Sequence, residues 1–310
     1  MPYRLVTGRF RLSYQGARFV GSKPDGESVW FKPDLPSLLQ GISGRDAKFN
    51  GGGFAQLRLE GIDALEVHFP RSWHQRQAEA AGARNYLLDT LLGFDVEYAG
   101  EAKDGRAATN PFPRSVSWSN PEAGVAGYIL TRAIDPYQRP VGFVYTGAPP
   151  RADRNGEVRL EAPALNQSAN ARIAEAGWAY PAYYTHRQNE GGLPVELRDR
   201  LIELSRTAFD NGHGVWGVDQ SRSNPQIRDY DQLKTLAIWP KLYRRLAAYF
   251  DAGNIGLARF DNWIRAEKDR DDQVVLVTRG ELGNLHDIYE VRGDRINMLY
   301  WPEELMVVPR

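Results

Sequence analysis

The 310-residue sequence contains no cysteine, and this absence removes several classes of chemistry at once. Disulfide bonds, thiolate catalysis and cysteine-based zinc sites all need a thiol, so none of them is expected. No stretch approaches the roughly 18 consecutive apolar residues that a membrane-spanning helix requires. The opening residues, MPYRLVTGRFRL, alternate apolar and polar side chains and lack the apolar segment of a secretory signal. We therefore expect a soluble, cytoplasmic protein with no membrane partner.

Neither sign of charge is in excess, because 39 Lys and Arg residues balance 39 Asp and Glu residues. Proteins that hold nucleic acid over a broad surface usually do so with an excess of basic residues. An anionic ligand must therefore be met by a small local cluster. Familiar catalytic motifs are also missing: the sequence has no Gly-rich phosphate loop, no His-Glu-x-x-His and no Gly-x-Ser-x-Gly. Its five histidines show no metal-ligand spacing.

What the chain does contain is a β-rich first part followed by helical patterns. Alternation predicts strands in YRLVTGRFRLSYQGARFVG, ESVWFKP, FAQLRLEGI and FDVEYAG, and a hairpin that joins GVAGYILTRAI to RPVGFVYTG through DPYQ. Helical spacing predicts one helix in each of RQAEAAGARNYLLDTLLG, ALNQSANARIAEAG and LPVELRDRLIELSRTAFDNGHG. Strands followed by helices indicate an α+β fold with helices on one side of a sheet or barrel.

A polar segment, SRSNPQIRDYD, is a candidate linker, so we divide the chain into domains over residues 1–220 and 221–310. The second, smaller α+β domain has two predicted helices, WPKLYRRLAAYFDAG and ARFDNWIRAEKDR, and two predicted strands, DQVVLVTRG and DRINMLYWP. The first of these helices carries Arg244 and Arg245. Its basic face could contact nucleic acid or could be a solvated face of an amphipathic helix. No protein partner and no role for this domain are predicted.

Charged residues gather at strand ends in three separate segments, PDGESVWF, LRLEGIDALE and DPYQRPVGFVY. If these ends meet at one rim of a sheet, they would form a site with two arginines and several carboxylates. Arginine binds phosphate in a bidentate fashion. A carboxylate pair can hold a hard cation, and a further carboxylate can deprotonate water. The alternative is a rim of surface salt bridges with little energetic weight. The residues concerned are Asp25, Glu27, Arg58, Asp63, Glu66, Asp135 and Arg139.

The ordered series of these motifs resembles the staphylococcal-type thermonuclease family. The series comprises Asp-Gly-acid-Ser-Val, then Arg-x₄-Asp-x₂-Glu, then the helical segment AEAAGARNYLLDTLLG, then Asp-x-Tyr-x-Arg, followed by IAEAGWAYPAYY and GHGVWGVD. The resemblance covers about residues 15–220, with insertions at 33–53, 104–125 and 150–163. It implies a five-stranded barrel of the oligonucleotide-binding (OB) type with packed helices. It also implies a metal-dependent endonuclease that hydrolyses phosphodiester bonds in DNA, RNA or both, with single-stranded substrate favoured.

The resemblance implies catalytic and substrate-binding roles at five positions. Arg58 and Arg139 would bind the phosphate, and Glu66 would act as general base or order the attacking water. Tyr183 would pack against the bound nucleotide, with the adjacent Tyr184 as an alternative. For both tyrosines, simple packing at the junction of helix and sheet is the competing interpretation.

The resemblance also implies a divalent cation, calcium in the first instance. Its ligands would be Asp63, the carbonyl oxygen of Ala64, and Glu27, which stands where the family has aspartate. The longer side chain of Glu27 moves its oxygens outward by on the order of 1 Å, while calcium takes oxygens at roughly 2.3–2.6 Å. Magnesium or manganese are therefore alternatives, and the need for a metal is itself open. Two other functions stay open: a nucleic-acid-binding module that has lost efficient catalysis, and hydrolysis of a phospholipid headgroup.

Overall fold

The computed structural model describes five stretches of the chain and the backbone of four short strands between them. The stretches are residues 2–12, 25–67, 77–94, 124–185 and 192–308, and the short strands are β2 (Tyr14–Gln15), β3 (Arg18–Phe19), β7 (Glu97–Tyr98) and β8 (Val116–Ser117). Most of the predicted insertion at 104–125 lies outside the described residues. Of the predicted strand FDVEYAG, residues 95, 96, 99 and 100 lie outside them, and Glu97 and Tyr98 form β7.

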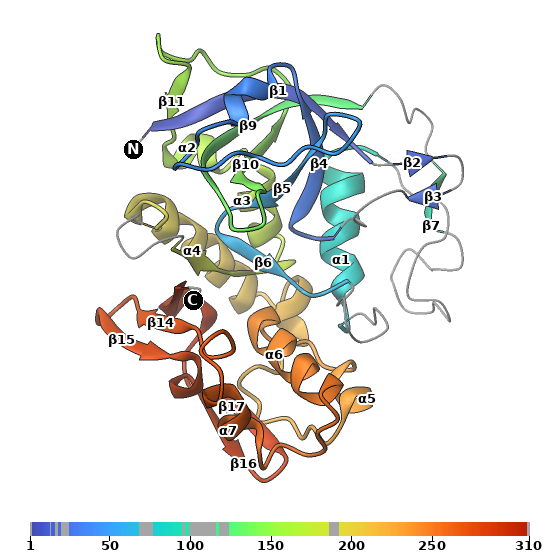
Figure 1. Cartoon of the computed structure of the whole chain (residues 1–310), viewed down its shortest axis with the longest axis vertical. Helices are drawn as coiled ribbons and strands as arrows, with labels where there is room; N and C mark the ends of the chain where they lie inside the picture. The colour runs from blue at the N-terminus through green and yellow to red at the C-terminus, as the bar shows by residue number, and fades with distance from the viewer. Residues whose placement is uncertain are drawn as a thin grey trace.

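A closed barrel of five strands forms the first part of the molecule (Figure 1). The strand order is β1, β4, β5, β10, β9, and β9 pairs again with β1 to close the barrel. Neighbours are antiparallel except β5 and β10, which are parallel. A further strand, β11 (Glu157–Arg159), pairs with the start of β1. The barrel strands are β1 (Pro2–Arg11), β4 (Ser28–Pro33), β5 (Ala55–Leu59), β9 (Val125–Ile134) and β10 (Pro140–Thr146). An α+β fold with an OB-like barrel is therefore what the chain forms.

The alternation read from the sequence explains which side chains fill this barrel. In β5, Ala55, Leu57 and Leu59 are buried, while the intervening side chains, including Arg58, project from the other face of the strand. In β1, Gly8 lies against β4 so closely that a Cβ atom would come within 2.3 Å of a backbone carbonyl oxygen. Burial of one face of β5 therefore fixes the strand register, and this register directs the Arg58 side chain away from the barrel interior.

The predicted hairpin between β9 and β10 is confirmed. Its connection is closed by a backbone hydrogen bond from the Asp135 N–H to the Arg139 carbonyl, 2.9 Å. A second bond, from the Gln138 N–H to the Asp135 carbonyl, also spans 2.9 Å. Gln138 adopts a left-handed φ of 63°, so the turn reverses the chain within a few residues. The hairpin places Arg139 directly before strand β10.

Helices pack beside the barrel, and one of them differs from the sequence prediction. The helix α1 (Ala80–Asn85) continues as a π-helix (Tyr86–Leu91). The predicted single helix in ALNQSANARIAEAG is wrong, because the structure has two helices, α2 (Ala162–Leu165) and α3 (Ala169–Glu175). Ser168 separates them: its hydroxyl donates to the Leu165 carbonyl and accepts from the Ala171 N–H, which caps α3. The long helix α4 (Val195–Asp210) forms as predicted.

The C-terminal part combines short helices with two small sheets (Figure 1). One sheet has the order β13, β18, β14, β15, so it includes a strand, β13, that precedes α4 in the chain. The other pairs β16 with β17. Strand β12 (Ala179–Pro181) pairs with β6 (Ile62–Ala64). The helices of this part are α5 (Tyr230–Leu233), α6 (Pro240–Asp251) and α7 (Phe260–Arg265). The strands of its sheets are β13 (Tyr183–Tyr184), β14 (Gln273–Leu276), β15 (Glu281–Asn284), β16 (Tyr289–Arg292), β17 (Arg295–Met298) and β18 (Leu305–Val308).

The described residues form two hydrophobic cores. The first fills the barrel and its contact with α3 and α4. The second lies among α6, α7 and the C-terminal strands, but it also includes Leu65, Val67, Ala80 and Tyr180 from the first part of the chain. Within the candidate linker, Ile227 is fully buried and belongs to this second core. The division at residue 220 stays a prediction, and the second core spans it. Among the described residues, none of the helices is long and apolar enough to cross a membrane.

Candidate functional site

A tight turn after β5 brings Arg58 to face Asp63. Gly61 has a φ of 82°, and a Cβ atom there would lie 2.5 Å from Cδ1 of Leu201, so both conformation and space favour glycine. The chain then returns as β6, in which Asp63 is fully buried. The Arg58 Nη2 donates to Asp63 Oδ1 at 2.9 Å and to the Ile62 carbonyl at 3.1 Å. The turn thus builds the first ion pair of the site from local sequence alone.

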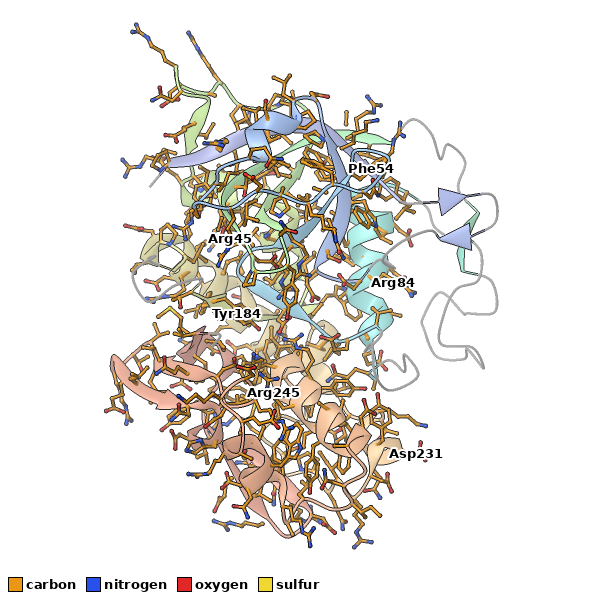
Figure 2. The ribbon with its side chains drawn as sticks, viewed as in Figure 1. Arg45, Phe54, Arg84, Tyr184, Asp231 and Arg245 are labelled. Carbon is orange, nitrogen blue, oxygen red and sulfur yellow. The ribbon has the colours of Figure 1, made fainter. Side chains whose placement is uncertain are left out.

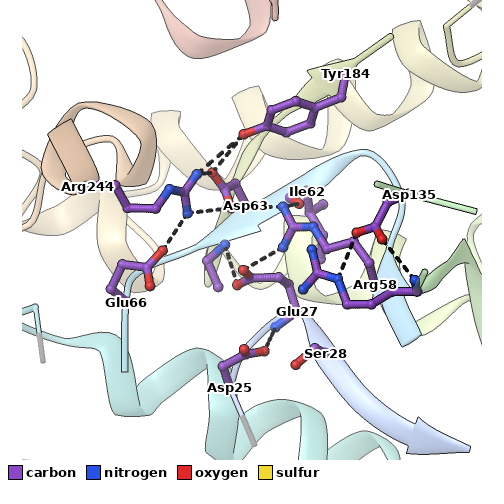
Figure 3. Close-up of polar contacts among 12 residues, drawn as sticks. Asp25, Glu27, Ser28, Arg58, Ile62, Asp63, Glu66, Asp135, Tyr184 and Arg244 are labelled. Carbon is purple, nitrogen blue, oxygen red and sulfur yellow. Dashed lines mark hydrogen bonds and ion pairs between the residues drawn. The ribbon is translucent and has the colours of Figure 1, made fainter. Parts of the chain in front are cut away.

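Glu27 joins this pair from the neighbouring strand. Ser28, the first residue of β4, lies opposite Arg58 in the sheet register, so Glu27 is delivered to the same strand end. Its Oε1 is 2.5 Å from Arg58 Nη1, and its Oε2 accepts the Ala64 N–H at 3.0 Å. Asp25 accepts the Glu27 backbone N–H at 3.1 Å and so supports the turn that precedes β4 (Figure 3).

The structure adds a residue that the sequence did not single out for the site, Arg244 of α6. Its Nη2 donates to Asp63 Oδ2 at 2.6 Å, and its Nη1 contacts Glu66 Oε1 and, at 3.3 Å, Asp63 Oδ1. The Tyr184 hydroxyl donates to Asp63 Oδ2 at 3.3 Å. Figure 3 shows Arg244 between the two carboxylates, with the Tyr184 hydroxyl directed at Asp63. Nothing in the spacing of WPKLYRRLAAYF links this helix to LRLEGIDALE, so only the fold reveals the contact.

Gln77 is a second residue that sequence reasoning missed. Its side chain is fully buried, and its Oε1 accepts the backbone N–H of Glu66 at 3.1 Å. Its Nε2 donates to the carbonyl of Ile238 at 2.5 Å, just before α6 begins. Gln77 therefore ties the backbone of Glu66 to the segment that carries Arg244, and it fixes the distance between the two sides of the site.

Arg139 lies at the same rim but makes a separate ion pair. Val141, two residues after Arg139, is the register partner of Arg58 in the sheet. Asp135 accepts the Arg139 Nε at 2.7 Å and its backbone N–H at 2.8 Å. Among the described residues, the Arg139 guanidinium forms ion pairs with neither Glu27, Asp63 nor Glu66. The nitrogens that Asp135 does not hold are thus available to a ligand at the rim.

The two tyrosines proposed for substrate binding point in opposite directions, as neighbours in a strand do. Tyr184 reaches the centre, whereas Tyr183 is 2 % exposed and donates to the Arg198 carbonyl at 3.4 Å. Six of the eight proposed site residues therefore form one connected network, and two do not. The connected residues are Glu27, Arg58, Asp63, Ala64, Glu66 and Tyr184; the others are Arg139 and Tyr183. We call the network of these six residues with Arg244 the acidic centre.

Burial and charge act in opposite directions on the two central carboxyl groups. For Asp63, burial opposes ionisation, but the guanidinium groups of Arg244 and Arg58 outweigh it and lower the pKa to about 2. For Glu66, burial is the larger effect and raises the pKa, with the negative charge of Asp63 acting in the same direction and Arg244 against it. Burial also raises the pKa of Tyr184, so its hydroxyl stays protonated and donates to Asp63. Asp63 is therefore a fixed negative charge.

The proposed cation ligands do not fit a divalent ion in this arrangement. Both oxygens of Asp63 accept hydrogen bonds from guanidinium groups, and Glu27 is held through Oε1 by Arg58 and through Oε2 by the Ala64 N–H. A cation placed between Asp63 and Glu27 would face the positive charges of Arg58 and Arg244. In the described part of the chain, no group of three or more His, Asp or Glu side chains is arranged to hold a metal. A divalent cation stays a prediction without a suitable ligand set here.

Comparison with known proteins adds no identification. No protein-family model matches the chain, and no curated protein matches it.

Proposed function

We propose that this protein hydrolyses phosphodiester bonds in nucleic acid, DNA or RNA, at the acidic centre and the adjoining Arg139. The observation that carries the proposal is the convergence of Glu27, Arg58, Asp63 and Glu66 at one end of a closed OB-like barrel. Their order along the chain resembles that of the staphylococcal-type thermonucleases. Convergence of distant segments on one charged rim supports a site more strongly than isolated surface ion pairs would.

In the proposed step, water attacks phosphorus and Glu66 accepts its proton. A bond forms between the water oxygen and phosphorus, the bond from phosphorus to the leaving oxygen breaks, and the leaving oxygen takes a proton from solvent. Burial raises the pKa of Glu66, which makes its carboxylate a stronger base than a surface glutamate. Arg139 binds non-bridging phosphate oxygens through the nitrogens that Asp135 leaves free, and Arg58 adds positive charge behind them.

Single-stranded substrate is favoured by an exposed aromatic side chain beside Arg139. Tyr137 is 77 % exposed, and the Arg139 guanidinium lies 5.5 Å from the centre of its ring. An exposed ring next to a phosphate-binding group is a surface on which an unpaired base can stack. Bases of a duplex are already stacked on each other and offer no free face. This neighbourhood therefore supports a single-stranded or frayed substrate.

A second candidate function is nucleic-acid binding without efficient cleavage. The observation that favours it is the saturation of the acidic centre: Arg58 is shared between Glu27 and Asp63, and Arg244 between Asp63 and Glu66. A base that is already ion-paired and 15 % exposed meets water less readily than a free one. In this alternative, Arg139 and Tyr137 bind the strand and no bond is broken.

One assay separates the two functions. Labelled single- and double-stranded DNA and RNA are incubated with the wild-type protein, with Glu66→Gln, and with the matched surface control Glu203→Gln, in calcium, magnesium, manganese or EDTA. Hydrolysis predicts a loss of cleavage of about 10²–10⁴-fold in Glu66→Gln and none in Glu203→Gln. Equal cleavage in all three proteins would refute the proposed role of Glu66. Binding without cleavage under every condition would establish the second function.

A further inference from the structure

We propose that the guanidinium of Arg244 is a built-in cation of the acidic centre and fills the space between Asp63 and Glu66, where a divalent ion could bind in its absence. The proposal assigns to the C-terminal part of the chain a residue of the site, and it makes the carboxylates of wild-type protein unable to bind calcium or similar ions. It rests on the proposed function for the location of the site and not for any catalytic step.

The contacts of Arg244 are those of a bridging cation. It reaches both oxygens of Asp63 and one oxygen of Glu66, so it neutralises two carboxylates from one position. The Asp63 side chain is 0 % exposed and that of Glu66 is 15 % exposed. Carboxylates this deeply buried need a compensating charge nearby, because ionisation without one is strongly unfavourable. Arg244 supplies that charge with its own planar, two-pronged donor geometry.

The balance of charges in the acidic centre also indicates that Arg244 takes the place of a bound cation. Glu27, Asp63 and Glu66 bring three negative charges to the centre, and Arg58 and Arg244 bring two positive ones. With Arg244 present, one negative charge remains. Without it, two remain around a space bounded by oxygens of Asp63 and Glu66, which is the donor type that hard divalent ions prefer. Removal of this single side chain therefore converts a saturated network into a cation site.

Arg244 is held in place by the surrounding structure. Its neighbours Tyr243 and Leu246 on α6 are fully buried in the second hydrophobic core, which also contains Leu65 from the segment that bears the acidic centre. Gln77 bonds to the backbone on both sides of the contact. Helix α6 could carry Arg244 away from the centre only by breaking this shared core. The backbone that bears Arg244 is therefore a fixed part of the site.

The proposal is tested by metal binding, measured as terbium luminescence and as calcium-dependent thermal unfolding of the full chain. Five proteins are compared: wild type, Asp63→Asn, Arg244→Met, Arg245→Met, and the double variant Arg244→Met with Asp63→Asn. Arg245 is the matched control, because it is the next residue on α6 (Figure 2) but pairs with Asp272. We expect no stoichiometric calcium binding to wild type or Arg245→Met at about 1 mM calcium, a concentration that fills moderate sites. We expect Arg244→Met to bind one ion and to gain thermal stability from it, and the double variant to bind none.

Three results would overturn the proposal. The first is binding of one calcium ion by wild-type protein that is lost in Asp63→Asn. The second is an Arg244→Met protein on which calcium has no effect. If this protein is folded, calcium does not bind to it or stabilise it; if it is unfolded without metal, calcium does not restore the fold. The third is calcium binding to the double variant that equals binding to Arg244→Met. Hydrolysis is measured in none of these arms, so the proposed function and the proposed cation fail on different experiments.

Discussion

At the scale of single residues, Asp63 is the position on which the acidic centre depends. It is fully buried and accepts hydrogen bonds from Arg58, Arg244 and Tyr184. Buried ion pairs add little net stability compared with apolar packing, but removing one partner leaves the others with uncompensated charge. Stability and the proposed function are thus joined in one side chain.

Replacement of Asp63 by Asn is therefore expected to destabilise the fold. The expected loss in the free energy of unfolding is about 3 kcal/mol, at the lower end for a broken buried pair, because Arg58 and Arg244 keep Glu27 and Glu66 as partners. Urea denaturation measures the loss. As a control, Asp261→Asn breaks an exposed pair with Arg265 and should cost less than about 0.5 kcal/mol. Similar losses in both variants would contradict the special position of Asp63.

A second residue-scale prediction concerns Tyr137, which has no packing role to lose. Tyr137→Ala should weaken binding of a short single-stranded oligonucleotide by about 1–3 kcal/mol if one base stacks on its ring. The melting temperature should not change, because the side chain is 77 % exposed. Fluorescence anisotropy gives the affinity. Ile255→Ala, which truncates an 85 % exposed side chain, serves as the control, and equal affinity of both variants would exclude stacking at this position.

Residues of the site were predictable from sequence where the contacts are local or follow from strand register. Arg58 and Asp63 lie on either side of one glycine turn, and Glu27 precedes the strand that pairs with β5. Arg244 was not predictable, because its approach depends on how α6 packs against the second core. Charge alone marks Arg244 and Arg245 equally, yet one pairs with Asp63 and the other with Asp272.

At the scale of elements, Ser168 shows how one hydroxyl divides a helix. It ends α2 by donating to the Leu165 carbonyl at 2.7 Å and starts α3 by accepting the Ala171 N–H at 3.1 Å. The hydrophobic spacing of ALNQSANARIAEAG continues through the break, which is why periodicity alone predicts a single helix. Local side-chain bonds to the backbone compete with helix continuation, and here they prevail.

Loss of this cap should be measurable. Ser168→Ala is expected to lower the free energy of unfolding by about 1–2 kcal/mol, because it removes the capping acceptor and leaves a fully buried backbone N–H without its partner. Thermal or urea unfolding provides the value. Ser168→Thr keeps the hydroxyl and should recover most of the loss. If the Thr variant is as unstable as the Ala variant, the loss comes from changed packing at this buried position and not from the missing cap.

The pairing of elements was less predictable than their existence. Helices α4 and α6, the β9–β10 hairpin and strand β17 all follow from local pattern. The sheet that joins β13 to β18 does not, since its partners are separated by about two-fifths of the chain and each is short. Short strands carry little alternation from which a pattern could be read, and their partners are chosen by tertiary packing.

At the scale of the whole molecule, the many buried tyrosines make the fold sensitive to alkali. Burial raises the pKa of each of them above its ordinary value, so ionisation is easier in the unfolded chain. The stabilisation is fully present below pH about 10 and is lost as the pH rises above that value. The residues are Tyr3, Tyr145, Tyr180, Tyr183, Tyr184, Tyr243 and Tyr289.

The free energy of unfolding is accordingly expected to fall steeply with pH above about 10.5. Lys241 acts in the opposite direction at lower pH: burial lowers its pKa to about 8, so its contribution to stability rises between pH 8 and the ordinary lysine value. Measurement above about 10.5 avoids this second effect. Tyr243→Phe should show a shallower slope than wild type, and an unchanged slope would mean that Tyr243 ionises without unfolding.

The sequence predicts the barrel part of the molecule in outline, as an α+β fold with five strands. It does not predict how the barrel part packs against the C-terminal part. Alternation reveals which face of a strand is buried but not which distant surface covers it. The second core is assembled from Leu65 and Val67 near the acidic centre and from helices beyond residue 220. Contacts between segments so distant in sequence carry no periodic signal.

The pairing of β13 with β18 also has a consequence for how the protein matures. Tyr184 reaches Asp63 from β13, and β13 is hydrogen-bonded to Met306 and Val307 in the last strand of the sheet. Chains emerge from the ribosome with the N-terminal part first, and the barrel can begin to fold at that stage. The acidic centre cannot be completed then, because Arg244 and the strand that holds Tyr184 in place have not yet emerged. Completion of the site therefore has to wait until these later segments of the chain have been synthesised.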